Sequence, residues 1–143
     1  MSKTVLIGKA KELYVATLLV AEHLHVYFPL VDNGFDLLVT SGDGTKFIPV
    51  QVKYKNARTG FSLNRADADQ FVKASAVIAF GSGTAEIDNF YFIPAKEWAR
   101  KAEDRARGDY KLVVYLGSDS EWAEQFKGAS GIKKAFKRVL PAA

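Results

Sequence analysis

The chain has 143 residues, of which 48% are hydrophobic and 25% charged, a composition that suits one globular domain and excludes a disordered chain. It has no cysteine, which excludes disulfides and thiolate metal sites, and no apolar run approaches the ~18 residues of a membrane span. A net charge of +4 permits a nucleic-acid partner without requiring one. We therefore expect a cytoplasmic protein with a single domain over residues 1–143 and no membrane partner.

Hydrophobic periodicity and turn residues divide the chain into helices and strands. Short turns join the first three expected strands, so these should be antiparallel neighbours, whereas a crossover helix leads to a fourth strand parallel to the third. The sequence thus predicts an α/β fold, with helices on the faces of a central mixed sheet and a C-terminal β-α-β-α extension. The expected elements are, in chain order, helix 4–24, strands 25–30, 35–39 and 47–54, helix 65–74, strands 76–80 and 89–93, helix 95–105, strand 111–116 and helix 131–140.

A glutamate in the first expected helix lies on a largely apolar helical face. At 3.6 residues per turn, Glu12 shares this face with Val5, Gly8, Ala16 and Leu19. Burying an unpaired carboxylate is costly, so the glutamate needs an explanation. Either it is a surface residue with small neighbours, or it points at polar residues further along the chain, and the hairpin that follows favours the second interpretation.

The β-hairpin over residues 32–55 carries most of the polar residues that could do chemistry. Because side chains alternate across a strand, Gln51, Lys53 and Lys55 share one face of its second strand. If the register places Asp36 on that face, a carboxylate, an amide oxygen and an ammonium converge on one patch. Such a patch suits a divalent metal ion beside a phosphodiester. The alternative is that the lysines guard a sheet edge and the aspartate is a surface acid.

Basic residues gather in two segments that contain no acidic residue. The first lies between Asp43 and Asp67, and the second follows Glu124. Together they could form one positive surface for nucleic acid, or each could be an ordinary solvated face. Their basic residues are Lys46, Lys53, Lys55, Arg58 and Arg65 in the first segment and Lys127, Lys133, Lys134, Lys137 and Arg138 in the second.

The order of these features resembles the PD-(D/E)XK nuclease superfamily, which includes restriction-enzyme cores, Holliday-junction resolvases and some homing endonucleases. The resemblance covers about residues 3–81 and rests on GKAKELYVATLL around Glu12, GFDLLV around Asp36 and IPVQVK around Gln51 and Lys53. Two positions depart from the common pattern. Phe35 precedes the aspartate where proline is common, and Gln51 stands where an acid is usual, although some members carry Q-x-K there.

The resemblance implies a restriction endonuclease-like fold and a Mg²⁺- or Mn²⁺-dependent endonuclease that hydrolyses DNA, with RNA not excluded. Lys53 would orient the attacking water or stabilise the transition state. The implied catalytic residues are Glu12, Asp36, Gln51 and Lys53, the implied metal ligands are Asp36, Glu12, Gln51 and the carbonyl of Val52, and the implied phosphate contacts are Lys55, Arg58 and Arg65.

Three functions remain open at this point. An active nuclease is favoured by the presence of Glu12, Asp36 and Lys53, and we expect it to be a homodimer because one active site cuts one strand. A catalytically weak or inactive nucleic-acid-binding module of the same fold is favoured by the amide at position 51. A structural protein without a nucleic-acid partner would show no salt-dependent DNA binding.

Overall fold

The computed structural model describes residues 2–31, 34–55, 60–82, 89–103, 111–115 and 119–141. Most elements lie where the sequence places them, with ends that differ by a few residues. They are α1 (Lys3–Ala21), β1 (His25–Tyr27), β2 (Leu37–Thr40), β3 (Phe47–Lys55), β4 (Gly60–Asn64), α2 (Arg65–Lys73), β5 (Val77–Ser82), β6 (Phe90–Pro94), α3 (Ala95–Glu103), β7 (Lys111–Tyr115), α4 (Ser120–Glu124), α5 (Gly128–Ala135) and the 3-10 turn η2 (Lys137–Val139).

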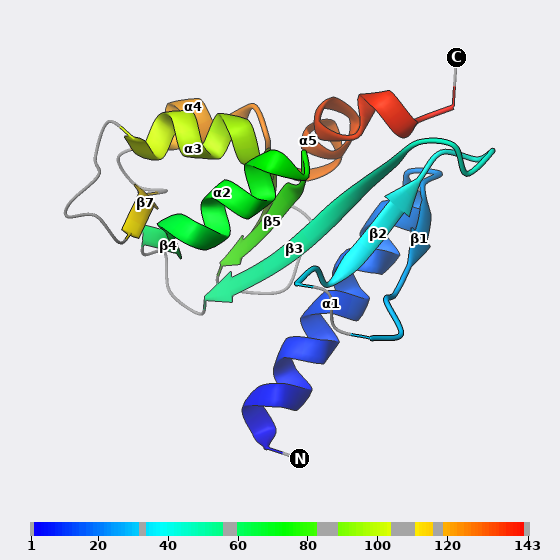
Figure 1. The fold of residues 1–143 in the computed structure, drawn as a ribbon, viewed down its shortest axis with the longest axis horizontal. Coiled ribbons are helices and arrows are strands. Elements are labelled where there is room, and N and C mark those ends of the chain that lie inside the picture. Colours follow the sequence, from blue (N-terminus) through cyan, green and yellow to red (C-terminus); the bar gives the residue numbers. More distant parts are fainter. Residues whose placement is uncertain are drawn as a thin grey trace.

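A five-stranded mixed sheet in the order β1-β2-β3-β5-β6 forms the centre of the protein (Figure 1). β1, β2 and β3 are antiparallel neighbours, and β3 runs parallel to β5, as the sequence predicts. β5 is buried along its whole length, which fits its continuous apolar sequence. β6 closes the sheet antiparallel to β5.

A second, two-stranded sheet contains β4, which lies between residues 54 and 65 where the sequence predicts neither a helix nor a strand. β4 pairs antiparallel with β7, and Phe61 faces Val114 in the register. Phe61 and Leu63 are both buried because alternate residues of β4 point into the same core. The C-terminal β-α-β-α extension therefore contributes β6 to the central sheet and β7 to the small one. The predicted phosphate contact Arg58 lies outside the described residues.

The two faces of the central sheet have separate cores. One core lies under α1 and α5, where Val15, Leu19 and Phe136 pack on the strands. The other lies under α2, α3 and the small sheet, where Trp98 and Phe61 are fully buried. Figure 1 shows α1 behind the sheet and α2 in front of it.

Local capping explains where two helices begin. Ser2 precedes α1 and its Oγ accepts a hydrogen bond from Val5 N at 3.3 Å. Asn64 caps α2, because its Oδ1 accepts a hydrogen bond from Asp67 N at 2.8 Å. The Asp67 carboxylate also lies in the first turn of α2, where it interacts favourably with the helix dipole. Side-chain caps therefore start the helices that flank the hairpin.

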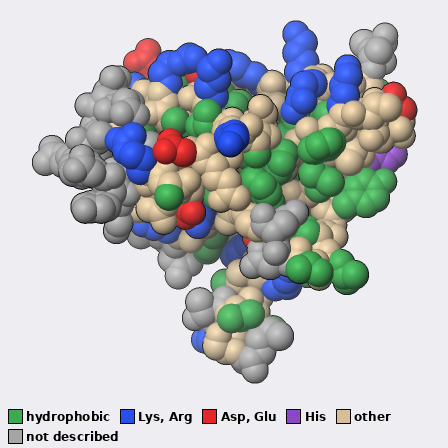
Figure 2. All heavy atoms as spheres, viewed as in Figure 1, with side chains coloured by type: hydrophobic (Ala, Val, Ile, Leu, Met, Phe, Trp, Pro, Cys, Tyr) green, Lys and Arg blue, Asp and Glu red, His purple; other side chains and the backbone are tan. Residues whose placement is uncertain are grey.

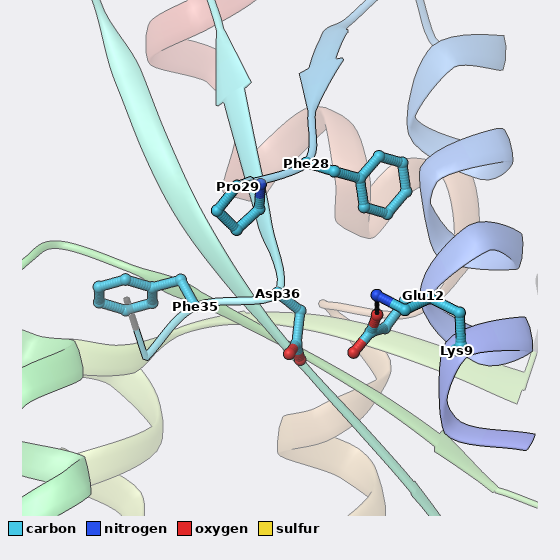
Figure 3. A pocket seen from close by; sticks show the side chains of 6 residues that line it. All are labelled: Lys9, Glu12, Phe28, Pro29, Phe35 and Asp36. Carbon is cyan, nitrogen blue, oxygen red and sulfur yellow. Dashed lines mark ion pairs between the residues drawn. The ribbon is translucent and has the colours of Figure 1, made fainter. Parts of the chain in front are cut away.

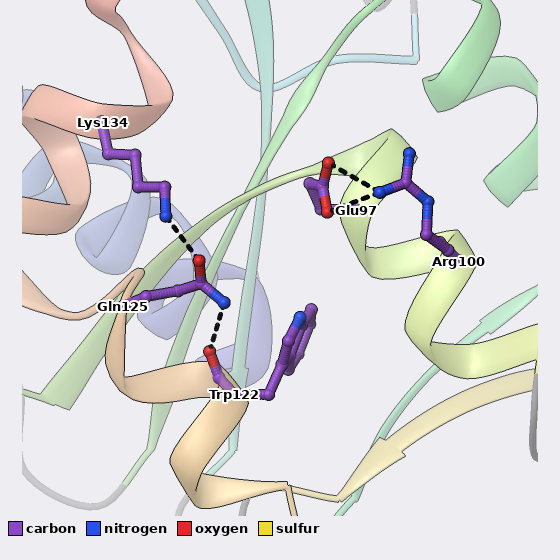
Figure 4. Close-up of polar contacts among 5 residues, drawn as sticks. All are labelled: Glu97, Arg100, Trp122, Gln125 and Lys134. Atoms are coloured by element: carbon purple, nitrogen blue, oxygen red, sulfur yellow. Dashed lines mark hydrogen bonds and ion pairs between the residues drawn. The ribbon is translucent and has the colours of Figure 1, made fainter.

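Side-chain hydrogen bonds link the C-terminal helices to one another (Figure 4). Lys134 of α5 donates to Gln125 Oε1, and Gln125 Nε2 donates to the carbonyl of Trp122 in α4 at 2.9 Å. On α3, Arg100 pairs with Glu97 one turn earlier at 3.3 Å. The bond between Lys134 and Gln125 links α5 to the end of α4.

The N-terminal half of α1 extends beyond the sheet (Figure 1). Leu6 and Leu13 on this helix are more than half exposed, as is Tyr27 on β1. Figure 2 shows hydrophobic side chains gathered on the face over β1 and β2, with Lys and Arg side chains along the upper edge. Within the described ranges, no helix is both long enough and apolar enough to cross a membrane.

Candidate functional site

The site begins where β2 separates from β3. Asp36 directly precedes β2, and its backbone N donates to Val50 O at 3.0 Å. At Val52 the side chain of Asp36 replaces the backbone of β2 as the hydrogen-bond partner of β3, because Asp36 Oδ2 accepts a hydrogen bond from Val52 N at 2.8 Å. The Asp36 carboxylate therefore occupies the edge of β3 that β2 has left.

The same geometry exposes a backbone oxygen. The N–H and C=O of one strand residue point to the same edge of the strand. Since Val52 N points at Asp36, the carbonyl of Val52 faces the same open edge. The carboxylate and the carbonyl are thus oxygen donors on one side of β3.

Glu12 approaches this edge from α1. The ends of the Glu12 and Asp36 side chains point toward each other in Figure 3. Glu12 Oε2 is buried and forms an ion pair with Lys9 Nζ at 2.8 Å, but no described residue meets this oxygen in hydrogen-bond geometry. The pocket between α1 and β2 holds about 260 Å³. It is lined by Lys9, Glu12, Phe28, Pro29, Phe35 and Asp36.

Burial changes the acidity of the aspartate. Desolvation raises the pKa of Asp36 to about 6, and the Glu12 carboxylate acts in the same direction. The Val52 N–H and the charge of Lys53 act in the opposite direction and lower this pKa. Burial and the Glu12 carboxylate therefore disfavour a negative charge on Asp36.

Gln51 and Lys53 lie on β3 beside Asp36. The pairing of Leu37 with Val50 places Gln51 next to Asp36 in the register. Lys53 is two residues further on the same face, and both side chains are half-buried. Lys53 is close enough to affect the pKa of Asp36, although neither residue is among those that line the pocket.

Two of the predicted phosphate contacts, Lys55 and Arg65, lie outside the pocket. Lys55 is exposed at the end of β3, and Arg65 is half-buried at the start of α2. Neither is among the described residues that line the pocket. The structure thus brings Glu12 and Asp36 together in one pocket and places Gln51 and Lys53 beside Asp36 on β3, whereas Lys55 and Arg65 do not line the pocket.

Four pocket residues were missed by the sequence analysis. Lys9 precedes Glu12 by one helical turn, a spacing that could have suggested an ion pair. Phe35 precedes Asp36 in the chain, and it packs on Phe71 of α2 with ring centroids 5.6 Å apart. Phe28 and Pro29 follow β1, and no local pattern connects them with α1.

The donor set fits a hard divalent cation. Carboxylate, amide and carbonyl oxygens are the ligands that Mg²⁺ and Mn²⁺ prefer. Two carboxylates face each other here, and the buried Glu12 Oε2 forms an ion pair with Lys9 but meets no described residue in hydrogen-bond geometry. No cluster of three or more His, Cys, Asp or Glu side chains occurs in the part of the chain that the structure describes, so further ligands would be Gln51, the Val52 carbonyl and water.

Comparison with known proteins supports the class of fold. The chain has a mixed α/β fold that matches the restriction endonuclease-like fold that the sequence predicts. Among solved structures it is similar to Hjc, a Holliday junction resolvase from the archaeal hyperthermophile Archaeoglobus fulgidus, with a TM-score of 0.63. The match covers 89% of this chain and 95% of the resolvase at 14% identity, so it shows the fold alone. No family model and no curated protein matches the chain.

Proposed function

We propose that the protein is a Mg²⁺- or Mn²⁺-dependent endonuclease that hydrolyses DNA phosphodiester bonds within a single domain over residues 1–143. One observation carries the proposal: the carboxylates of Glu12 and Asp36 meet in one pocket at the point where β2 leaves β3. Lys53 lies on the adjoining strand, and its positive charge lowers the pKa of Asp36. The likeness to a Holliday junction resolvase supports the same class of chemistry and adds branched DNA to the candidate substrates.

The roles of the residues follow from their chemistry. Asp36 and Glu12 would hold the cation, with Gln51 Oε1 and the carbonyl of Val52 as uncharged ligands. When bound, the ion would withdraw electrons from the phosphate and make water a stronger nucleophile. The Lys53 ammonium would donate to a non-bridging phosphate oxygen and stabilise the charge that develops as water attacks. The Val52 N–H holds one Asp36 oxygen in place.

The basic residues beyond the pocket would bind the DNA backbone. Lys55, Arg58 and Arg65 are the proposed phosphate contacts, and they give affinity without sequence preference. Each phosphate contact releases counterions, so binding should weaken steeply as salt rises. RNA offers the same phosphates and stays an alternative substrate.

The active form is proposed to be a homodimer. One site cuts one strand, so paired cuts in a duplex or a junction need two copies. Exposed apolar residues on α1 and β1, such as Leu13 and Tyr27, support an unfilled interface on this side of the molecule. Sedimentation equilibrium on the full chain measures the oligomeric state, and a monomer at micromolar concentration would contradict this part of the proposal.

Cleavage assays test the main proposal. Labelled linear duplex, single-stranded and four-way-junction DNA would be incubated with Mg²⁺ or Mn²⁺ at moderate salt. We expect metal-dependent cutting that falls by about 100-fold or more in Asp36→Ala and Lys53→Ala. Lys96→Ala is the matched control, because Lys96 is exposed on α3 and outside both basic segments, and it should cut as the wild type does. Equal cutting by all variants would refute the assignment of the site.

A nucleic-acid-binding module is the second candidate. The amide of Gln51 favours it, because an uncharged ligand where an acid is usual weakens the hold on a cation. This candidate predicts salt-dependent DNA binding by the wild type without cutting. Gln51→Glu would then be expected to restore cation-dependent cleavage.

A further inference from the structure

Lys9 is the pocket residue whose position the proposed chemistry does not explain. It lies on α1 one turn before Glu12, and its ammonium contacts Glu12 Oε2 at 2.8 Å (Figure 3). That oxygen is buried and is one that a cation would use. A positive side chain therefore occupies the place at which a positive ion is proposed to bind.

The two partners of this ion pair differ in exposure. The Glu12 side chain is 19% exposed, whereas the Lys9 side chain is 59% exposed. A lysine has a four-carbon stem with several rotatable bonds, so an exposed one can move its charge by several ångströms without moving the helix. Glu12 would stay in place while Lys9 moves away.

The surroundings of Lys9 favour a position at the rim of the pocket. Its Nζ lies 5.8 Å from the centre of the Phe28 ring, across the pocket opening from α1. A lysine side chain is a cation at neutral pH, and the Glu12 and Asp36 carboxylates line the same pocket. An ammonium at this rim could reach a phosphate that approaches Asp36.

We propose that Lys9 is a positioning residue that exchanges partners: it pairs with Glu12 while the pocket holds no metal ion, and it moves to a DNA phosphate when a divalent cation takes the Glu12 oxygen. Two cations cannot share the buried oxygen without repulsion, so the ion displaces the ammonium. The freed ammonium of Lys9 then increases the affinity for DNA. The inference rests on the proposed function and names a regulating contact within the same site.

The exchange predicts opposite effects of one substitution on two ligands. Without its competitor, the pocket of Lys9→Gln should bind the metal ion more tightly, by about two- to five-fold for an exposed ion pair. DNA affinity should fall in the same variant when a divalent cation is present, and the salt dependence should lose about one phosphate contact. In EDTA the loss of DNA affinity should be much smaller, because Lys9 is then held by Glu12. If Lys9 had a purely structural role, Lys9→Gln would not raise the affinity for the metal ion while it lowers the affinity for DNA.

Two variants serve as matched controls. Lys11→Gln removes the same charge from the same helix, but Lys11 Nζ lies over the Tyr54 ring at 4.1 Å and outside the pocket. It should change metal affinity less than Lys9→Gln does. Lys9→Arg keeps a cation that can pair with Glu12 and should bind metal as the wild type does.

The measurement is titration of the full-length protein with Mn²⁺ alone, by calorimetry and by electron paramagnetic resonance of free Mn²⁺. DNA anisotropy in EDTA and in Ca²⁺ follows on the same proteins. Tighter Mn²⁺ binding by Lys9→Gln, with weaker DNA binding only in Ca²⁺, would support the exchange. Equal Mn²⁺ affinity of Lys9→Gln and wild type would overturn it and leave the nuclease proposal intact. Absence of Mn²⁺ binding in both proteins would overturn both.

Discussion

The first third of the chain and the remainder bury their hydrophobic residues to very different degrees. All the large hydrophobic side chains that are exposed in the described residues lie between Val5 and Phe47, on α1, β1, the turn after β1 and the start of β3. Further along the chain, Trp98, Phe126 and Phe136 are buried almost completely. The candidate site lies in the exposed region, with Glu12 on α1 and Asp36 before β2.

The difference follows from how many layers cover each part of the sheet. The C-terminal helices and the small sheet close a core that is rich in aromatic contacts, such as Phe61 on Phe80 with centroids 4.3 Å apart. Around β1 and β2, an apolar groove of about 500 Å³ includes Tyr27, Leu38 and Phe47. We call the core under α2, α3 and the small sheet the closed region, and α1 with β1, β2 and the start of β3 the open region. The closed region therefore provides the rigid support, and the open region offers the surface that meets other molecules.

Trp98→Ala should have the largest effect on stability, because this residue is central to the closed region. Trp98 is fully buried, and a substitution of this kind in a core costs about 3–5 kcal/mol. Leu13→Ala in the open region should change the free energy of unfolding by less than about 0.5 kcal/mol. Urea unfolding followed by circular dichroism measures both.

Trp98→Phe is a useful companion to that pair. Trp98 Nε1 is buried without a hydrogen-bond partner among the described residues, so phenylalanine loses volume but no hydrogen bond. It should cost less than half as much as alanine. Similar losses for Trp98→Ala and Leu13→Ala would remove the contrast between the two regions.

Two glycines test the same contrast through packing. A Cβ at Gly131 would lie 1.9 Å from Phe126 O, so Gly131→Ala must displace the backbone and should cost about 2 kcal/mol. A Cβ at Gly8 would have no neighbour within 4 Å, and Gly8→Ala should stabilise α1 by about 0.5–1 kcal/mol. Thermal unfolding of both variants and the wild type shows whether each substitution raises or lowers stability. A loss of stability in Gly8→Ala as well as in Gly131→Ala would mean that α1 is covered in solution.

Asp36→Asn should stabilise the protein at neutral pH. Burial raises the pKa of Asp36 from its ordinary value of 3.8 to about 6, so ionising this carboxyl destabilises the folded state. This penalty is absent below about pH 3.8, grows between there and about pH 6, and is complete above that pH. Solvent screening of this half-buried group leaves a difference of about 1 kcal/mol.

The check on that prediction is unfolding in urea at several pH values without divalent cations. The advantage of Asp36→Asn should be complete above about pH 6, shrink as the pH falls below that value, and vanish below about pH 3.8. Mn²⁺ should then stabilise the wild type but not the variant, since the variant lacks a charged ligand. An advantage that stays constant across this pH range would contradict the desolvation of Asp36.

The sequence predicts much of the fold because its signals are local. The helix around Glu12, the hairpin and the buried run of β5 can each be read from their own spacing, and their order gives the mixed sheet. β4 could not be predicted this way. Gly60, Ser62 and Asn64 resemble turn residues, and the partner strand β7 lies far along the chain.

The site was predictable only where side-chain direction follows from spacing. The helical face of Glu12 and the shared face of Gln51 and Lys53 both follow from period alone. The contact between Asp36 and the backbone of Val52 does not, because it depends on the point at which β2 leaves β3. Lys9 was missed for a different reason: a lysine one turn from a glutamate is common on any exposed helix.

The hydrogen bond from Val52 to Asp36 makes one backbone amide an indicator of events in the pocket. Its proton lies against a single carboxylate oxygen, with 2.8 Å between nitrogen and oxygen. Protonation of that carboxylate, or arrival of a cation on it, will therefore shift the nuclear magnetic resonance signal of Val52. The occupancy of the site can thus be followed in solution through an isotope label alone, without a substrate.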